Sequence, residues 1–170
     1  MPARAAVGSK RESGAMTSTD QPDRAAAERA RAGDMDLTLF GDNHIEAYEA
    51  TDGETGYLWN GAPILVLTTT GARSGNERKH ALIFGTDGDD VVIVASKGGD
   101  PNHPQWYLNL DADPHVKVQV KGDRYDGIAR TASGDERARL WSMMNELWPS
   151  YADYQERTDR EIPVVVISRA

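Results

Sequence analysis

The sequence predicts an α+β fold that is mainly β, in which about six antiparallel strands close into a barrel flanked by helices. Short segments rich in valine, isoleucine and threonine recur between residues 63 and 168, and tight turns containing glycine or aspartate join several of them. Few helical patterns interrupt this series. Because closure into a barrel removes exposed strand edges, it is the arrangement that such a series favours.

The composition indicates one soluble globular domain. The chain has 170 residues, of which 39% are hydrophobic and 27% are charged. A net charge of −8 argues against non-specific binding to nucleic acid, which relies on a basic surface. The absence of cysteine excludes disulfides and thiolate chemistry. Neither a membrane span of roughly 20 apolar residues nor a secretory signal is visible, so we expect a cytoplasmic protein.

The chain divides into an N-terminal tail and one folded domain. Residues 1–34 are predicted to be disordered or weakly helical, and residues 35–170 to form the barrel. Residues 1–22 are small, polar and charged, which is typical of disorder. The segment Asp23–Arg31 contains good helix formers, but its only apolar residues are alanines, so we expect a marginal helix or tail there.

Strands account for most of the domain. The six predicted strands are Pro63–Thr70, Ala81–Thr86, Val91–Ala95, His115–Lys121, Arg124–Thr131 and Pro163–Ser168. The third is continuously apolar, which predicts burial on both of its faces. The fourth alternates: its valines should face inward, and His115, Lys117, Gln119 and Lys121 should face water. A Gly122–Asp123 turn joins it to the fifth in a hairpin.

Three further helices are predicted within the domain. A short one covers residues 42–51 and begins at Asp42 or Asn43. A second covers Pro104–Leu110. The third runs from about Asp135 to Trp148, where apolar residues recur every three or four positions.

The turn "TTTGARSGNER" at residues 68–78 carries an unusual concentration of positive charge. Arg73, Arg78 and the following Lys79 oppose one acid, Glu77, inside a protein of net charge −8. Successive amides of a glycine turn form a concave site for anions, the Ser74 hydroxyl adds a donor, and arginine forms forked bonds to phosphate. The turn therefore fits a phosphate site, and it equally fits a hairpin loop with solvated arginines.

A second cluster of the same kind ends another strand. Residues 94–99, "VASKGG", again combine a hydroxyl, a cation and two glycines. Two such clusters at strand ends suggest two walls of one pocket, in which Gly98 and Gly99 let the backbone approach a flat ligand. The alternative is a loop with a single exposed lysine.

Aromatic residues lie near both clusters. Trp106 and Tyr107 fall on the predicted short helix, where a tryptophan is more often part of the core than part of a ligand site. Trp148, Tyr151 and Tyr154 follow at three-residue intervals and share one side if Pro149 begins a helix. Such residues either pack at an interface or cover a cleft and donate hydrogen bonds.

Other chemistries lack their motifs. The four histidines have no metal-ligand spacing, so we expect no metal site. The sequence has no G-x-S-x-G, P-loop or G-x-G-x-x-G motif. An anion-anchored pocket with aromatic walls and few acid–base groups suits a protein whose cofactor performs the chemistry.

Several ordered motifs resemble the deazaflavin-dependent nitroreductase family of actinobacteria. They are "LTTTGARSGNER", "VVIVASKGGDPNHPQWYLNL", "DPHVKVQV" and "WPSYADYQERTDREIPVVVI", and the similarity runs from about Leu39 to Ile167. The resemblance implies a split β-barrel of the FMN-binding type. It also implies an oxidoreductase that uses reduced coenzyme F420 to transfer hydride to quinones, nitroaromatics or similar acceptors.

The resemblance also implies residue roles. The cofactor-binding residues would be Ala72, Arg73, Ser74, Arg78, Lys79, His80, Ala81, Leu82, Ile83, Val94, Ala95, Ser96, Lys97, Gln105, Trp106, Tyr107, Leu108, Asn109 and Tyr151. The catalytic residues around the electron acceptor would be Ser96, Tyr151 and Tyr154.

Two departures from the family pattern bear on the acceptor. Ile83 and Trp148 stand where prodrug-activating members carry tyrosines, which argues against nitroimidazole reduction and leaves quinone reduction as the expected activity. Two alternatives stay open: an FMN-binding split-barrel oxidoreductase, and a non-catalytic F420-binding carrier. The oligomeric state and peripheral contact with the inner face of the cell membrane also stay open.

Overall fold

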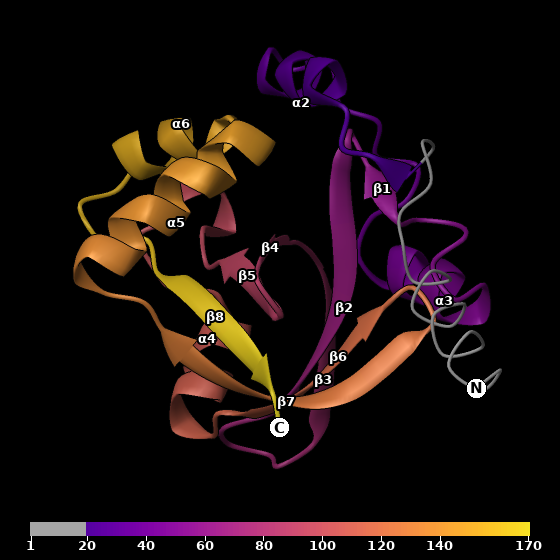
Figure 1. Cartoon of the computed structure of the whole chain (residues 1–170), viewed down its shortest axis with the longest axis vertical. Helices are drawn as coiled ribbons and strands as arrows, with labels where there is room; N and C mark the ends of the chain where they lie inside the picture. Colours follow the sequence, from indigo (N-terminus) through magenta and orange to yellow (C-terminus); the bar gives the residue numbers. More distant parts are fainter. Residues whose placement is uncertain (1–19) are drawn as a thin grey trace, which may run out of the picture.

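The computed structural model of the chain describes residues 20–170 and shows an antiparallel sheet curled into a half-barrel, with helices around it (Figure 1). The strands are β1 (Leu58–Trp59), β2 (Ala62–Thr70), β3 (Glu77–Ile83), β4 (Gly85–Asp87), β5 (Asp90–Val94), β6 (His115–Val120), β7 (Asp123–Thr131) and β8 (Val164–Arg169). The helices are α2 (Arg24–Arg31), α3 (Asp42–Ala50), α4 (Gln105–Ala112), α5 (Gly134–Leu147) and α6 (Ser150–Glu156), with a short 3-10 helix, η2 (Lys97–Gly99). The split-barrel prediction is confirmed. The disorder predicted for residues 1–22 falls almost entirely outside the described residues.

The predicted strands are present, with one division and one addition. The strand expected at 81–86 is two strands, β3 and β4, separated by Phe84. Strand β3 also begins earlier than predicted, because its first three residues are exposed and polar and give no alternation of hydrophobicity. The additional strand, β1, has only two residues and forms a hairpin with the start of β2.

The sheet topology leaves a gap in the barrel. Strand order is β1-β2-β6-β7-β8-β5-β4, and β3 pairs with β2 away from this path. Strand β3 therefore lies at one end of the sheet and β4 at the other, although only Phe84 separates them in the chain. Among the strands that residues 20–170 form, none pairs with the outer edge of β3, so the barrel is open between β3 and β5.

Alternating side chains of β5 and β8 serve two hydrophobic cores. Val91 and Ile93 face the inside of the barrel, together with Val165 of β8. Val92 and Val94 face the other way, where α2, α5 and α6 cover the sheet. This explains the continuous apolar run of β5 and confirms its predicted burial on both faces.

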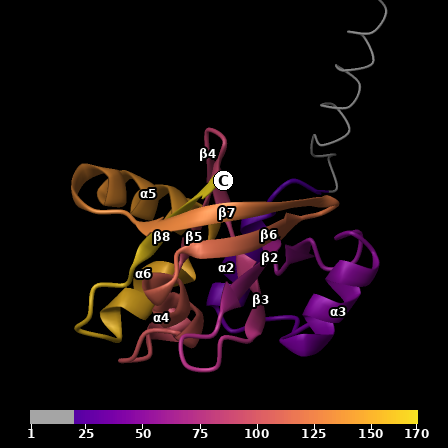
Figure 2. The same cartoon turned by 90° about the horizontal axis from the view of Figure 1, so that it is seen from below.

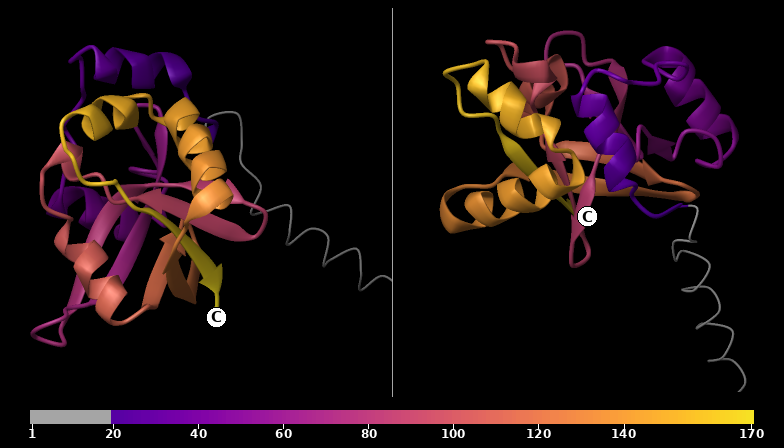
Figure 3. Two further views of the ribbon diagram at one scale, coloured as in Figure 1. Left: turned by 90° about the vertical axis from the view of Figure 1, so that its left-hand side faces the viewer. Right: turned by 90° about the horizontal axis from the view of Figure 1, so that it is seen from above.

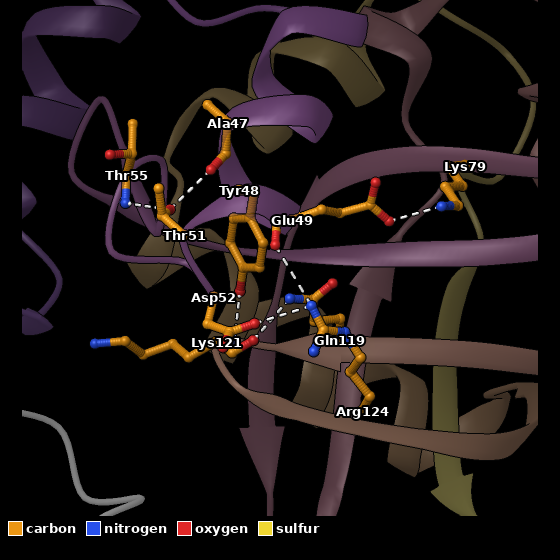
Figure 4. A network of polar contacts seen from close by, with 10 residues as sticks. All are labelled: Ala47, Tyr48, Glu49, Thr51, Asp52, Thr55, Lys79, Gln119, Lys121 and Arg124. Atoms are coloured by element: carbon orange, nitrogen blue, oxygen red, sulfur yellow. Dashed lines mark hydrogen bonds and ion pairs between the residues drawn. The ribbon is translucent and has the colours of Figure 1, made fainter.

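Helix α3 lies on the side of the molecule away from α5 and α6 (Figure 2), and its Ile45 and Tyr48 belong to the core inside the barrel. The buried Tyr48 hydroxyl donates to the Ile64 carbonyl at 2.8 Å. It also accepts from the Lys121 amide at 2.8 Å (Figure 4). Gln119 is also buried, and its amide donates to the Lys121 carbonyl. The prediction that Gln119 faces water is wrong. It was based on the β6–β7 hairpin alone, whereas in the folded sheet β6 also pairs with β2 and the Gln119 side chain is buried.

Helix α2 packs against α6 (Figure 3). Its alanines Ala27 and Ala30 are buried, and Arg31 forms a forked ion pair with Asp153 of α6 at 2.8 and 2.9 Å. The helical alternative for this segment is therefore the observed one. Small side chains are what allow this close contact between helices.

Candidate active site

A cavity of about 630 Å³ occupies the gap between β3 and β5. Its walls are β3, the end of β5 with the loop that follows, the first turn of α4, helix α6, and the first turn of α3. The volume is in the range of sites for small molecules and cofactors. The split in the barrel thus creates the cavity, because the unpaired edge of β3 forms one wall.

Many of the residues predicted from the sequence line this cavity. They are Lys79, His80, Ala81, Leu82, Ile83, Val94, Ser96, Lys97, Gln105, Trp106, Tyr151 and Tyr154. Of the two strand ends that the sequence suggested as walls of one pocket, the "VASKGG" loop lines this cavity; the glycine–arginine turn does not, and the lining on that side begins at Lys79 of β3.

The remaining predicted residues lie outside the cavity lining. They are Ala72, Arg73, Ser74, Arg78, Ala95, Tyr107, Leu108 and Asn109. Asn109 is buried and has a supporting contact instead: its side chain accepts from the Ala72 amide and donates to the Thr69 hydroxyl. Tyr107 bonds the Thr131 hydroxyl at 2.8 Å. The binding roles of these residues stay predictions.

The β2–β3 turn uses most of its own amides. The Gly71 amide donates to the Asn76 carbonyl and the Gly75 amide donates to the Gly71 carbonyl. The Asn76 amide donates to the Ser74 hydroxyl. Within residues 20–170, the amides of Arg73 and Ser74 have no such partner. The amide concavity suggested by the sequence is therefore smaller than five residues, and the arginine side chains must supply most of the attraction for an anion.

The charged side chains in and beside this turn differ in whether they form ion pairs. Lys79 forms an ion pair with Glu49 of α3 at 2.7 Å (Figure 4), and Glu77 pairs with Lys117 at 3.1 Å. Arg73 and Arg78 form no ion pair within the part of the chain that the structure describes, and both are exposed. They are the cations of this turn that remain available to a negatively charged ligand.

The opposite side of the cavity is aromatic. Tyr151 is buried and stacks edge-on against Tyr154, with ring centroids 6.1 Å apart. Burial raises the pKa of Tyr151 well above its usual value, and the neighbouring Tyr154 raises it further. Its hydroxyl forms no hydrogen bond with residues 20–170. Tyr151 is therefore a neutral donor with an unused hydrogen bond.

Several lining residues come from segments to which the sequence assigned no role. They are Phe40, Gly41, Asp42, His44, Ile45 and Trp59. Trp59 donates its indole N–H to the Leu39 carbonyl at 2.8 Å and lies against Trp148, with ring centroids 5.7 Å apart. The available signal was a tryptophan beside a glycine turn, "LWNGAP", but local sequence does not show that it meets Trp148.

His80 is half-buried in the cavity wall. Burial lowers the pKa of its imidazole, and the Asp42 carboxylate opposes this shift more weakly. The ring is therefore neutral at pH 7. Its Nδ1 atom is buried and has no hydrogen-bond partner among residues 20–170.

Comparisons with known proteins place the chain in a family. The family model described as F420H(2)-dependent quinone reductase matches residues 42–169. The F420H(2)-dependent quinone reductase Rv1261c of Mycobacterium tuberculosis is 44% identical over 130 residues, which cover 74% of this chain and 87% of the relative. The putative F420H(2)-dependent quinone reductase Rv3178 of the same organism is 37% identical over 105 residues, covering 62% of this chain and 88% of that protein.

Solved structures show the same relationship. A structure titled as an F420-H2 dependent reductase, FDR-A, is 45% identical and superposes with a TM-score of 0.59, covering 62% of this chain and 94% of its own. A structure titled as a domain-swapped dimer is 40% identical, with a TM-score of 0.61, covering 73% and 96%. No helix formed by residues 20–170 is long and apolar enough to cross a membrane. From the family match over most of its length, the chain belongs to the F420H(2)-dependent quinone reductase family.

Proposed function

We propose that this protein binds reduced coenzyme F420 in the cavity between β3 and β5 and transfers its hydride to a quinone. The observation that carries the proposal is the chemical difference between the two sides of this one cavity. Its β3 wall leads to a turn with two unpaired arginines, and its other side is built from aromatic residues and hydroxyls. A flat redox ring with a negatively charged tail matches both features.

The coenzyme end of the site rests on charge and backbone. Arg73 and Arg78 would hold the phosphate and the anionic tail, with Ser74 as an additional donor. The unpaired edge of β3 presents main-chain groups to a ring that carries its own hydrogen-bonding groups. When bound, the reduced deazaflavin supplies a hydride from its C5 position.

The acceptor end rests on apolar surface and hydroxyls. Trp59, Trp148 and Ile83 give a flat apolar wall for a quinone ring. The Tyr151 hydroxyl would donate to the quinone oxygen on which negative charge develops, and the Ser96 and Tyr154 hydroxyls lie in the same cavity. Since its pKa is raised, Tyr151 stabilises this charge by a hydrogen bond and retains its own proton. The quinone becomes a hydroquinone when it has received this hydride and one proton, and the proton would come from solvent.

The chain's own residues also hold the two reactants together and exclude water. Hydride transfer needs donor and acceptor atoms about 3–3.5 Å apart. The buried aromatic residues Trp106, Trp148 and Tyr151 line the cavity, and their apolar surface favours stacked rings over solvent there.

Reduction of nitroaromatics and an FMN-dependent activity are weaker candidates. Replacement of tyrosine by Ile83 and Trp148 leaves fewer donors for a nitro group. The single phosphate of FMN would use only part of the cationic turn.

For lipid-soluble acceptors we include transient contact with a membrane surface in the proposal. Leu37 and Phe40 are 55% and 64% exposed, and Phe40 lies at the cavity.

A direct test compares ligands and activity in one preparation. F420 and FMN are titrated separately by fluorescence, and oxidation of reduced F420 is followed by absorbance with the soluble quinone menadione. We expect F420 to bind more tightly than FMN and menadione to be reduced. Binding of F420 without oxidation of reduced F420 by any quinone would instead indicate a non-catalytic carrier. Tighter binding of FMN than of F420 would indicate an FMN-binding oxidoreductase.

A separate experiment tests the membrane contact by sedimentation with lipid vesicles, compared between the wild type and Phe40→Ser. If the wild type does not sediment with the vesicles, the membrane contact is removed from the proposal.

A further inference from the structure

The loop after β5 holds an unusual backbone conformation. Lys97, Gly98 and Gly99 have φ values of 47°, 63° and 85°, which places three consecutive residues in the left-handed region. A lysine is disfavoured there, since its Cβ approaches the backbone too closely. Ser96, Lys97 and Gly98 all line the cavity, so this conformation decides where their groups lie. Such a loop needs support from outside itself.

Arg160 supplies that support. Its Nε donates to the Asp100 carbonyl at 2.8 Å, one terminal nitrogen donates to the Ser96 carbonyl at 2.8 Å, and the other donates to the Ala95 carbonyl at 3.2 Å. The guanidinium thus bonds the two ends of the loop at the same time. Arg160 lies in the segment between α6 and β8 and does not line the cavity.

The same guanidinium reaches a further wall. The nitrogen that bonds Ala95 also donates to Nδ1 of His103 at 3.0 Å. For Nδ1 to accept this bond, the ring must be neutral with its hydrogen on Nε2. Residue 103 immediately precedes Pro104 and Gln105, which line the cavity at the first turn of α4. Arg160 therefore joins the start of α4 to the loop after β5.

Helix α6 lies against the same loop. The Arg157 guanidinium donates to the Gly98 carbonyl at 3.2 Å. A Cβ atom at Gly99 would lie 2.5 Å from the Tyr154 carbonyl oxygen, so glycine is required for this close approach. The walls that carry Ser96, Gln105 and Tyr154 therefore meet around a few polar contacts, and Arg160 makes most of them.

We propose that Arg160 is a positioning residue for the hydride transfer proposed above, and that it acts by holding the loop after β5 and the start of α4 in register with the acceptor tyrosines. This inference rests on the proposed function. The forked guanidinium is required because its fixed donors meet three carbonyls and a ring nitrogen in different directions. A lysine ammonium, which is a compact point charge, cannot span them.

The test compares Arg160→Met and Arg160→Lys with Arg137→Met. Arg137 is a suitable control because its part-buried guanidinium also bonds a main-chain carbonyl, that of Ile162, at 2.6 Å, yet it does not line the cavity. Each variant is assayed with F420 and menadione for the F420 dissociation constant, kcat and KM. Hydrogen–deuterium exchange of peptides covering residues 95–105, together with the melting temperature, is measured on the same preparations.

We expect both Arg160 variants to exchange faster in residues 95–105 and to lose about tenfold or more in kcat. We expect Arg137→Met to lower the melting temperature without either effect. Arg160→Lys keeps the charge, so its loss of kcat would show that geometry matters. Wild-type exchange in residues 95–105 of Arg160→Met, or wild-type kcat in a folded Arg160 variant, would overturn the inference. Because exchange does not depend on activity, a failure of the proposed function would appear separately, as wild-type protein that does not oxidise reduced F420.

Discussion

The two regions of the proposed site, the cationic turn beside the cavity and the aromatic residues that line it, are built in opposite ways. At the β2–β3 turn, Arg73 and Arg78 are exposed, lie five residues apart in the chain and depend on few contacts. At the aromatic end, Trp59 of β1 meets Trp148 and Tyr151, which come from a much later part of the chain at the junction of α5 and α6, and all three lie in or beside a buried core. We conclude that the charged side chains of the turn can be substituted without unfolding the protein. Substitutions in the aromatic region, in contrast, change both the stability of the protein and the shape of the site.

Replacing the central residue of the aromatic end should have the largest effect. Trp148→Ala removes an indole that is 2% exposed and packs against Trp59. We expect a loss of about 3–5 kcal/mol in the free energy of unfolding, because a large cavity remains. Denaturant titration followed by circular dichroism measures this loss. Leu108→Ala, at a side chain that is 43% exposed, is the control and should change stability by no more than about 0.5 kcal/mol.

A smaller change at the same end should separate chemistry from stability. Tyr151→Phe removes only a hydroxyl that has no partner in the described part of the chain. We expect kcat for quinone reduction to fall about 10- to 100-fold, with little change in F420 affinity, because the lost donor acts on charge that develops in the transition state. Steady-state kinetics beside a fluorescence titration measures both. Unchanged kcat would remove Tyr151 from the mechanism, and Tyr125→Phe, outside the cavity lining, serves as the control.

The cationic end should respond in the reverse sense. Arg73→Ala and Arg78→Ala should each weaken F420 binding about 5- to 10-fold at low salt, because each removes a charge-assisted contact. They should leave the melting temperature nearly unchanged, since both side chains are exposed. High salt should shrink the difference from the wild type. The control is Arg139→Ala, which removes an exposed arginine paired with Asp87 outside the cavity. Equal losses in all three variants would contradict a specific role for the turn.

The smallest expected effect concerns pH. The pKa of His80 lies below 6.5 because of burial, and that of His103 is lowered by burial and then by the Arg160 charge. As the pH falls from about 6.5, the unfolded chain binds protons that the folded chain does not. The free energy of unfolding should therefore decrease until the pH passes below the folded pKa values. Denaturant titrations between pH 5 and pH 8, of the wild type and of His80→Gln, test this; the variant should show a shallower dependence.

Local sequence predicted what local structure determines. The apolar run of β5 and the valines of β6 predicted those strands, and the arginine–glycine motif predicted the turn between β2 and β3, because each depends on neighbours in the chain. Gln119 and Trp59 were misjudged or missed. Gln119 is buried in the sheet between Val66 of β2 and Arg124 of β7, and Trp59 lies against Trp148; no short window of sequence shows these contacts.

The amides of the β2–β3 turn show a different limit. Their number could be read from the sequence, but their use by Asn76, Ser74 and Asn109 could not. Likewise, Arg160 resembles any other charged residue near a helix end until the carbonyls around it are placed. Contacts between main-chain groups and distant side chains are the part of the site that required the structure.

The most direct test of the central claim is a crystal structure of the protein with F420. We predict that the deazaflavin ring lies between β3 and the loop after β5, and that a phosphate oxygen lies about 3 Å from a guanidinium nitrogen of Arg73 or Arg78. A ring bound outside this cavity, or a tail directed away from both arginines, would contradict the account.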